Sequence, residues 1–298
     1  MELFKKQFEK FRLITEEKLF GCFPEIDGEH GMISEACRYS LLAGGKRIRP
    51  VMCLAGAEML GINYDEVMDF ACAIEMIHTF SLIHDDLPGM DNDDFRRGKP
   101  TCHKVFGEAI AILAGDALLN KAYDNMINHC IKFPSQGKIE AMKIISEATG
   151  ENGMIGGQVI DIQSEEHKIE IELLRKLHSM KTGALLKAPL MVPVSIADVN
   201  NDTKRVISGY ADEIGLAFQI QDDILDVIST SEEMGKTVGK DAKSNKSTYV
   251  TLLGLDGAKT HLEIAVNKAV DYLITLEKMG YEVDFFKDLS YYLLKRKN

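Results

Sequence analysis

Apolar residues recur at helical spacing along almost the whole chain, and this periodicity limits the possible folds more than any other feature. Alternating patterns typical of strands are nearly absent. The seven prolines leave long uninterrupted segments, and no stretch has the composition of a linker. We therefore predict an all-α protein. The predicted helices cover residues 30–43, 50–61, 65–86, 107–130, 136–149, 170–182, 184–197, 203–227, 258–279 and 283–295.

A chain of 298 residues could form two average domains. Because no linker stands out, we expect a single domain over 1–298. The first residues, M-E-L-F-K-K-Q-F-E-K-F, form an amphipathic helical pattern without the apolar core of a secretory signal. No apolar run approaches the length of a membrane span. We expect a cytoplasmic protein with no integral membrane segment.

Charge and cysteine content argue against two functional classes. The net charge of −11 argues against a nucleic-acid-binding surface, and the basic residues occur in local groups. The six cysteines contain no C-x-x-C pair, so a disulfide framework or a zinc site is not expected. We expect reduced, mostly buried thiols. Neither a G-x-G-x-x-G turn nor a phosphate-binding G-x-x-x-x-G-K-[ST] loop is present.

A first acidic cluster lies between residues 83 and 99, in I-H-D-D-L-P-G-M-D-N-D-D-F-R-R-G-K. Asp85 and Asp91 are six positions apart, so on an unbroken helix they would point about 240° apart. Proline removes a helical donor and glycine tolerates unusual dihedral angles. We therefore expect Pro88-Gly89 to end or bulge the helix and to redirect Asp91. The other members of the cluster are Asp86, Asp93 and Asp94, followed by Arg96 and Arg97.

A second acidic cluster follows about 130 residues later, in Q-I-Q-D-D-I-L-D at 219–226. Asp222 and Asp226 are spaced i and i+4, which places both on one helix face, with Gln219 one turn earlier on the same side. Asp223 lies between them in sequence. Downstream lysines follow this cluster at Lys236, Lys240, Lys243 and Lys246.

Two acidic clusters, each followed by bases, suggest a site that holds polyanions through bridging cations. Mg²⁺ is commonly held by one or two carboxylates together with substrate phosphates and water. Arginine binds phosphate oxygens with a two-pronged fork, whereas lysine acts as a mobile point charge. Either cluster alone is more often solvated surface or a helix cap. Together, and preceded by apolar residues, they would bury charge at high cost without ions or partners.

A third basic group, G-G-K-R-I-R-P at 44–50, separates two predicted helices. We expect its glycines to end the first helix and Pro50 to start the second. A charge run of this kind is usually solvated, but the flexible Gly44-Gly45 pair favours a grip on a diphosphate. Lys181-Thr182-Gly183 is predicted to end another helix, and is ambiguous by itself.

Taken in order, these motifs resemble the trans-prenyltransferases, in particular bacterial farnesyl diphosphate synthases. The resemblance rests on G-G-K-R-I-R-P, H-D-D-L-P-G-M-D-N-D-D-F-R-R-G-K-P-T-C-H, G-G-Q-V-I-D, H-S-M-K-T-G-A-L, F-Q-I-Q-D-D-I-L-D and N-K-S-T-Y. It covers nearly the whole chain. It implies a homodimeric all-α fold, with helices around a deep central cavity and the two aspartate motifs facing each other across its mouth.

The resemblance also implies a role for each motif residue. Asp85, Asp91 and Asp222 would coordinate three Mg²⁺ ions with substrate bound, while Asp86, Asp223 and Asp226 would orient water or neighbouring bases. The allylic diphosphate would contact Arg96, Lys181 and Lys236. Isopentenyl diphosphate would be held by Gly45, Lys46, Arg49, His78 and Arg97. Arg47 belongs to the motif with a less certain role.

The implied reaction begins with heterolysis of the allylic C–O bond, where metals and bases stabilise the departing diphosphate. Thr182, Gln219 and the carbonyl of Lys181 would direct dipoles at the allylic cation. The double bond of isopentenyl diphosphate then attacks, and the released diphosphate takes the final proton. Lys181, Thr182, Gln219, Asp85 and Asp86 are therefore the predicted catalytic residues.

Product length is predicted from the residues before Asp85. In the resembling family, bulky side chains at those positions form the cavity floor, and here they are Phe80 and Ser81. A helical wheel places Ser81 below Asp85 and Phe80 about 140° around the helix. The aromatic ring favours a fifteen-carbon product, farnesyl diphosphate, with geranylgeranyl diphosphate as the alternative. His78 shares a face with Asp85, and by spacing alone would be interpreted as a core histidine.

Three other functions remain as alternatives. A terpene cyclase would share the first aspartate motif, but usually replaces the second with an Asn/Ser/Glu-type metal site. A noncatalytic prenyltransferase subunit typically loses one aspartate cluster, whereas this chain retains both. A phosphatase with paired metals would consume one diphosphate without joining carbons.

Overall fold

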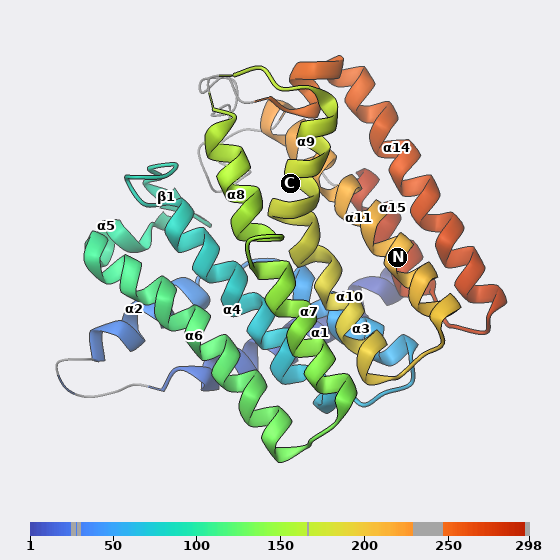
Figure 1. Cartoon of the computed structure of the whole chain (residues 1–298), viewed down its shortest axis with the longest axis horizontal. Helices are drawn as coiled ribbons and strands as arrows, with labels where there is room; N and C mark the ends of the chain where they lie inside the picture. Colours follow the sequence, from blue (N-terminus) through green and yellow to red (C-terminus); the bar gives the residue numbers. More distant parts are fainter. Residues whose placement is uncertain (25–27, 29–30, 166, 229–246, 296–298) are drawn as a thin grey trace.

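The structure, a computed structural model, describes residues 1–24, 28, 31–165, 167–228 and 247–295. Helices dominate this part of the chain, so the all-α prediction is confirmed (Figure 1). The helices in order are α1 (Glu2–Cys22), α2 (Gly31–Leu41), α3 (Ile48–Met59), η1 (Tyr64–Glu66), α4 (Met68–Asp85), α5 (Cys102–Phe106), α6 (Glu108–Lys132), α7 (Gln136–Thr149), α8 (Met154–Gln163), α9 (Ile171–His178), η2 (Ser179–Gly183), α10 (Ala184–Ile196), α11 (Asn201–Ile228), α14 (Tyr249–Lys278) and α15 (Asp284–Lys295).

A single short hairpin is the only sheet in the described ranges. Strand β1 (Phe95–Arg96) pairs antiparallel with β2 (Lys99–Pro100). The two residues between them, Arg97 and Gly98, both have positive φ, at 53° and 74°. Positive φ at both central residues is the requirement of a tight two-residue hairpin turn. This turn directs the two consecutive arginines of the first acidic motif to different partners.

Most predicted helices occur within a few residues of their expected bounds, and three differences have local causes. Helix α8 was not predicted, because two adjacent glycines, Gly156 and Gly157, weaken its helical pattern. Helix α14 begins at Tyr249, nine residues before its predicted start at 258, and contains Gly254 in a non-helical conformation. Pro50 does not start α3, which begins at Ile48. Pro50 is instead the third residue, where a missing N–H leaves no helical bond unmade.

The predicted helix end at Lys181-Thr182-Gly183 is wrong. Helix α9 continues into η2, a single π-helical turn, and then directly into α10. Gly183 has helical dihedral angles of −62° and −42°. Isolated π-turns inside helices are uncommon and occur frequently at functional sites. The motif therefore lies on a locally widened helix and not at a helix end.

Helix α4 runs through the middle of the molecule and is buried along most of its length (Figure 1). It packs against α3, α6 and α10. One continuous core cluster of the described residues extends from Phe4 in α1 to Leu293 in α15. Because a continuous core is typical of one domain, we infer a single domain over 1–298. The burial of α4 places the end of that helix, at Asp85, inside the helical body.

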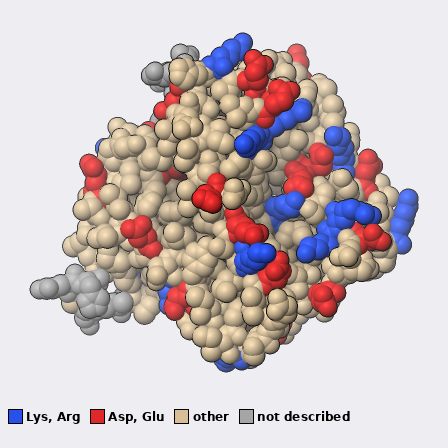
Figure 2. All heavy atoms as spheres, in the orientation of Figure 1, with Lys and Arg blue, Asp and Glu red and all other residues tan. Residues whose placement is uncertain are grey.

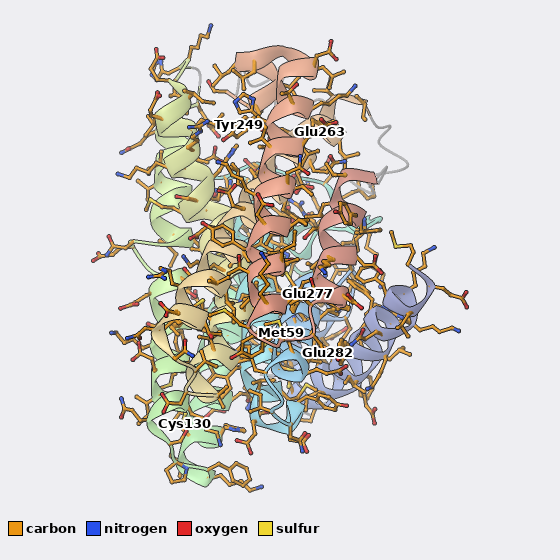
Figure 3. The ribbon with its side chains drawn as sticks, turned by 90° about the vertical axis from the view of Figure 1, so that its right-hand side faces the viewer. Met59, Cys130, Tyr249, Glu263, Glu277 and Glu282 are labelled. Atoms are coloured by element: carbon orange, nitrogen blue, oxygen red, sulfur yellow. The ribbon has the colours of Figure 1, made fainter. Side chains whose placement is uncertain are left out.

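Charge is spread unevenly over the face seen in Figure 2. Lysine, arginine and carboxylate side chains gather over α11 and α14, while fewer lie over α6 and α8. Turned by 90°, the molecule shows α14 along its length, with Tyr249 near one end and Glu277 near the other, close to Met59 and Glu282 (Figure 3). Helix α14 packs along α11, which carries the second acidic motif. None of the helices in the described part is long and apolar enough to cross a bilayer.

Candidate active site

The first acidic motif folds back on the end of α4. The helix ends at Asp85, and the backbone N–H of Asp91 then donates to the carbonyl of Asp85 at 2.8 Å. In a second bond of this turn, the N–H of Asp93 donates to the carbonyl of Asp86 at 3.1 Å. The predicted break at Pro88-Gly89 is therefore confirmed. The turn returns Asp91 to the neighbourhood of Asp85, which an unbroken helix could not do.

Asp85 is in an electrostatically unfavourable position as a carboxylate. Burial raises its pKa to about 6, and although Lys181 opposes this rise, the charges of Asp91 and Asp86 add to it. A buried, crowded carboxylate is stabilised in its charged form by a nearby cation. Asp85 and Asp91 offer oxygen ligands, which hard cations such as Mg²⁺ prefer. The donor set at the end of α4 therefore fits a magnesium ion.

The protein side chains do not complete a metal site alone. In the described ranges, no group of three or more His, Cys, Asp or Glu side chains lies close enough to hold a metal ion. Mg²⁺ usually keeps water and takes further ligands from substrate phosphates. The two acidic motifs therefore offer partial sites, which a phosphorylated ligand would complete.

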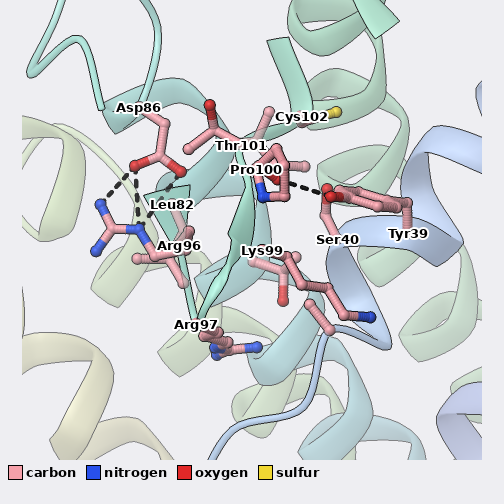
Figure 4. A pocket seen from close by; sticks show the side chains of 13 residues that line it. Tyr39, Ser40, Leu82, Asp86, Arg96, Arg97, Lys99, Pro100, Thr101 and Cys102 are labelled. Carbon is pink, nitrogen blue, oxygen red and sulfur yellow. Dashed lines mark hydrogen bonds and ion pairs between the residues drawn. The ribbon is translucent and has the colours of Figure 1, made fainter. Parts of the chain in front are cut away.

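Arg96 pairs with two carboxylates of the first acidic motif, Asp86 and Asp93. Its Nε donates to Oδ1 of Asp86 at 3.0 Å (Figure 4). Its Nη2 lies 3.3 Å from Oδ2 of Asp93. Asp86 is buried, and that burial raises its pKa despite the adjacent guanidinium. Lys99 and Pro100 extend from the other strand of the hairpin, where the carbonyl of Pro100 accepts from the Tyr39 hydroxyl at 2.8 Å. Asp86 therefore orients Arg96 at the edge of the site.

The double glycine lets Arg97 approach the loop before α3. Nη1 of Arg97 donates to the carbonyl of Gly44 at 2.5 Å. A Cβ added to Gly45, whose φ is 122°, would lie 2.8 Å from Cζ of Arg97. Only glycine therefore satisfies both the backbone angle and the close contact. Lys46, the next residue, has an exposed position in the same loop.

A buried glutamate, Glu75, contacts both Arg47 and Arg97. The carboxylate of Glu75, on α4, lies 2.7 Å from Nη1 of Arg47 and 3.7 Å from Nη2 of Arg97. Arg47 is almost fully buried, and its Nη2 donates to the carbonyl of Leu41 at 2.6 Å. The side chain of Arg47 thus faces the core. Its contacts indicate that it supports the loop structurally.

Arg49 and His78 lie in the same electropositive region. Burial lowers the pKa of the Arg49 guanidinium to about 10, although the charges of Glu75 and Asp222 oppose the shift. Its Nε is buried and has no hydrogen-bond partner among the described residues. Burial, followed by the charges of Arg49 and Arg97, lowers the pKa of His78 well below its usual value. His78 is therefore neutral at neutral pH, beside a guanidinium with an unused donor.

The π-turn brings Lys181 against α8. Nζ of Lys181 lies 2.6 Å from Oδ2 of Asp161. A Cβ added to Gly157, one turn before Asp161, would lie 2.2 Å from the backbone nitrogen of Lys181. Gly157 therefore allows the two backbones to touch, and this contact sets the position of the ion pair. Thr182 follows Lys181 on the same turn and is half-buried.

The second acidic motif divides into two kinds of carboxylate. Asp222 and Asp226 are half-buried on one face of α11, as their spacing predicts. Asp223 is buried, and its Oδ2 accepts the backbone N–H of Tyr249 at 2.8 Å. Its Oδ1 accepts from Nε2 of Gln219 at 3.1 Å. Asp223 thus binds the first turn of α14.

The two residues predicted to set product length lie on different sides of α4. The ring of Phe80 is buried and packs edge-on against His84, with ring centroids 5.1 Å apart. His84 in turn contacts the carbonyl of Ile112 on α6, so Phe80 lies on the side of α4 that faces α6. Ser81 is half-buried and donates to the carbonyl of His78 at 2.9 Å.

Sequence reasoning missed three residues that shape the site: Glu75, Asp161 and His178. Glu75 has the spacing of an ordinary core position, although a buried charge needs a partner. Asp161 is the last residue of the G-G-Q-V-I-D segment, to which the sequence analysis assigned no function. His178 is buried before the π-turn, where burial lowers its pKa to about 4. Lys236, together with Lys240, Lys243 and Lys246, lies outside the described residues.

The chain matches the family model of polyprenyl synthetase over residues 30–271. A farnesyl diphosphate synthase from Micrococcus luteus is 44% identical over 264 residues, which cover 89% of this chain and 89% of that protein. A geranylgeranyl diphosphate synthase from Cyanophora paradoxa is 43% identical over 262 residues, covering 88% and 87%. Relatives of nearly equal similarity thus carry names for two product lengths.

Solved structures resemble the whole chain. A geranyltransferase from Legionella pneumophila has a TM-score of 0.87 at 31% identity, covering 100% of this chain and 99% of that one. A geranyltransferase from Helicobacter pylori, complexed with magnesium and isoprenyl diphosphate, has a TM-score of 0.85 at 32% identity, covering 99% and 96%. The chain therefore belongs to the polyprenyl synthetase family and is a trans-prenyltransferase, which joins isopentenyl diphosphate to allylic diphosphates.

Proposed function

We propose that this protein condenses isopentenyl diphosphate with dimethylallyl and geranyl diphosphates to give (2E,6E)-farnesyl diphosphate. The observation that carries the proposal is the environment of Asp85. Its half-buried carboxylate is close to Asp91 and Lys181, which combines metal ligands and a diphosphate-binding base at one position. A second carboxylate, Asp222, approaches Arg49 from α11. This arrangement provides separate positions for two diphosphate groups.

Asp85 and Asp91, with Asp222 opposite them, are the proposed ligands of Mg²⁺. Bound magnesium would neutralise the negative charge that develops on the departing diphosphate. The related Helicobacter pylori structure contains magnesium and an isoprenyl diphosphate, which supports the assignment. We propose three ions per site with substrate bound. Asp86 orients Arg96 and is not a ligand in this scheme, because its oxygens are occupied by the guanidinium.

Lys181 and Arg96 are the proposed partners of the allylic diphosphate, and Lys236 completes the set. Asp161 holds Lys181 by its Nζ, so the ammonium group is oriented before substrate binds. Preorganised charges of this kind stabilise a developing negative charge without reorganisation during the reaction. As the C–O bond breaks, both electrons leave with the diphosphate oxygen, where these bases interact with it.

Arg49, Arg97, His78, Lys46 and Gly45 are the proposed site for isopentenyl diphosphate. The unused Nε donor of Arg49 supports this assignment, because a buried guanidinium nitrogen without a partner is costly unless a ligand satisfies it. Neutral His78 can donate one hydrogen bond without adding to the repulsion between the arginines. Glu75 contacts Arg97 of this set and also the neighbouring Arg47, which supports the loop.

Stabilisation of the allylic cation is assigned to neutral dipoles. The hydroxyl of Thr182, the amide of Gln219 and the carbonyl of Lys181 would face the carbon chain. A π-turn changes the usual helical hydrogen-bond pattern, so it can expose a backbone carbonyl that an α-helix would use internally. Weakly nucleophilic groups suit this role, since a strong nucleophile would trap the cation. The released diphosphate accepts the proton lost in the last step.

The position of Phe80 supports the proposed fifteen-carbon product. Phe80 lies five residues before Asp85, about 7.5 Å along the helix axis. Its buried ring packs against His84 on the side of α4 that faces α6, and we propose that it limits chain growth from Asp85. Geranylgeranyl diphosphate is the second candidate product, because a relative of that name is as similar as the farnesyl synthase.

Product analysis tests the proposal. The purified protein is incubated with isopentenyl diphosphate, labelled geranyl diphosphate and Mg²⁺, beside an Asp85→Ala control. We expect labelled farnesyl diphosphate from the native protein and none from the control. A twenty-carbon diphosphate would retain the mechanism and reject the assigned product. A cyclic hydrocarbon would favour a terpene cyclase, free phosphate without chain growth a phosphatase, and no product a noncatalytic subunit.

Phe80→Ala tests the assignment of the floor. Removing the ring opens space between α4 and α6, so we expect products longer than fifteen carbons. Phe70→Ala is a matched control, because Phe70 is a buried aromatic residue on the same helix whose ring packs on His129. An unchanged product length in Phe80→Ala, with turnover intact, would exclude Phe80 as the floor.

We propose that the protein is a homodimer that uses the α6 face. Helix α6 exposes Ile112, Leu113, Ile127 and Ile131, with Ile131 at 73% exposure. Few charged side chains lie over α6 and α8 in Figure 2. Exposed apolar side chains that gather on one helix are typical of association sites. Sedimentation of Ile127→Asp/Ile131→Asp should give a monomer, while a dimer in the double variant would exclude this face. We also propose that the protein is located in the cytoplasm.

A further inference from the structure

A surface groove of about 400 Å³ lies between α1, α4 and α6, away from the aspartate motifs. Its wall includes Cys22, the last residue of α1, together with Lys18 and Asn125. Cys22 is half-buried, so small molecules in the groove can reach its sulfur. The reaction proposed above makes no use of this groove.

Two neighbouring contacts join α1 to α4 below the groove. Nζ of Lys18 lies 3.0 Å from Oδ1 of Asp69. One turn further along each helix are Cys22 and Cys72, whose thiols are near enough to shift each other's pKa. Cys72 is fully buried. The Lys18–Asp69 pair thus aligns α1 with α4 so that the accessible thiol of Cys22 lies near the buried thiol of Cys72.

The surroundings of Cys22 favour its thiolate. Nδ2 of Asn125 lies 3.6 Å from its sulfur. The neighbouring Cys72 thiol lowers the pKa of Cys22, assisted by Asn125 and by the charge of Lys18. In the opposite direction, the pKa of Cys72 is raised well above its usual value. At neutral pH the accessible cysteine is therefore the nucleophile, and the buried one retains its proton.

We propose that Cys22 is an oxidant-sensitive modification site at which a hydroperoxide forms a reversible Cys22–Cys72 disulfide. The Cys22 thiolate attacks one peroxide oxygen, the O–O bond breaks, and the departing oxygen takes a proton to form water. The resulting sulfenic acid has its sulfur beside Cys72. The Cys72 sulfur then attacks it, the S–O bond breaks, and a second water leaves with the thiol proton. Two thiols and one hydrogen peroxide thus give one disulfide and two waters.

Other cysteines provide internal controls. Cys37 and Cys102 are also near each other, since Cys102 contributes to the raised pKa of Cys37, but both are buried. Cys130 is half-buried like Cys22, and burial raises its pKa. Exposure alone would therefore make Cys22 and Cys130 equally reactive. Exposure together with thiolate character singles out Cys22.

The first experiment is peptide mapping by mass spectrometry after treating the native full-length protein with hydrogen peroxide. We expect the first disulfide to join Cys22 and Cys72, and to be reversed by a thiol reductant. Cys72→Ala should stop the reaction at a sulfenic acid on Cys22, trapped by dimedone, and Cys130→Ser should react like the native protein. A first disulfide between Cys37 and Cys102, or oxidation of Cys130 before Cys22, would overturn the proposal.

A second measurement remains informative if substitution of the buried Cys72 disturbs folding. Iodoacetamide should alkylate Cys22 in the native protein at least about fivefold faster than Cys130 at pH 7, since thiolate fraction rises faster than nucleophilicity falls. Asn125→Ala should reduce that ratio. Equal rates at Cys22 and Cys130 would contradict the proposal.

Discussion

Nζ of Lys181 lies 2.6 Å from Oδ2 of Asp161, and this ion pair joins the π-turn to α8. Both side chains are mostly shielded from solvent, so the contact is stronger than a typical surface pair. It fixes the ammonium group of a residue that we assign to the allylic diphosphate. Asp161 is therefore a positioning residue that acts through Lys181.

Asp161→Asn should lower kcat/KM about 10- to 100-fold, because a mobile Lys181 loses its preset orientation. Steady-state kinetics with geranyl diphosphate measures the effect, and circular dichroism checks the fold. Asp212→Asn is the matched control, since Asp212 binds Lys187 at 2.8 Å on the exposed surface of α11. Equal losses in the two variants would remove Asp161 from the site.

Gly157→Ala should destabilise the protein by about 1–3 kcal/mol and reduce turnover. The new methyl group would meet the backbone nitrogen of Lys181 at 2.2 Å, which forces α8 and the π-turn apart. Urea unfolding gives the change in free energy. Gly21→Ala is the control, because a Cβ at Gly21 meets nothing within 4 Å. It should be neutral or slightly stabilising, as alanine favours a helix.

Glu75→Gln should cost about 3 kcal/mol of unfolding free energy, since the buried Arg47 guanidinium loses its carboxylate partner at 2.7 Å and keeps the longer contact with Glu16 at 3.6 Å. The KM for isopentenyl diphosphate should also rise, because Arg97 loses its contact with Glu75. The control is Glu277→Gln, whose exposed pair with Lys287 contributes at most about 1 kcal/mol. If both variants have equal stability, the role assigned to Glu75 is wrong.

Asp223→Ala should be more destabilising than Asp226→Ala, although the two residues have similar places in the motif. Asp223 accepts bonds from Gln219 and from the backbone of Tyr249, so its loss leaves a buried amide unpaired at about 1–3 kcal/mol. Asp226 is half-buried. Thermal unfolding of both variants without substrate compares them. The reverse order would refute the capping role.

The pKa of Asp85 predicts a pH-dependent stability in the absence of metal. Because burial raises its pKa from 3.8 to about 6, protonation favours the folded state. This contribution is complete below pH 4 and is lost as the pH rises through about 6, at a cost of about 2–3 kcal/mol. Other carboxyl groups titrate in the same range. The informative quantity is therefore the difference between native protein and Asp85→Asn.

Urea unfolding at pH 4.5 and pH 7.5 measures that difference. The native protein should lose more stability between these values than Asp85→Asn, and Asp91→Asn should show a smaller loss, because the Asp91 charge raises the pKa of Asp85. Added Mg²⁺ should restore stability at pH 7.5 in the native protein alone. Parallel pH profiles in all three proteins would contradict the assignment.

Local sequence was sufficient for most helices and for the turn that returns Asp91 to Asp85. Helix periodicity is set by neighbouring residues, and Pro88-Gly89 acts on the chain next to it. The same reasoning failed at the π-turn, where Lys181-Thr182-Gly183 has the composition of a helix end. In the structure the helix continues through these residues, and Gly157 and Gly215 from neighbouring helices pack against the turn. Tertiary contacts therefore overrode the local signal.

The sequence by itself determined the all-α class, the order of the motifs and their chemical types. Only the tertiary structure decided which carboxylates bind protein groups and which are left for the cations that we propose. Asp86 is occupied by Arg96 and Asp223 by the start of α14, while burial raises the pKa of Asp85. The physical reason is that burial and charge depend on residues brought together from distant helices, whereas helix formation depends on residues adjacent in the chain.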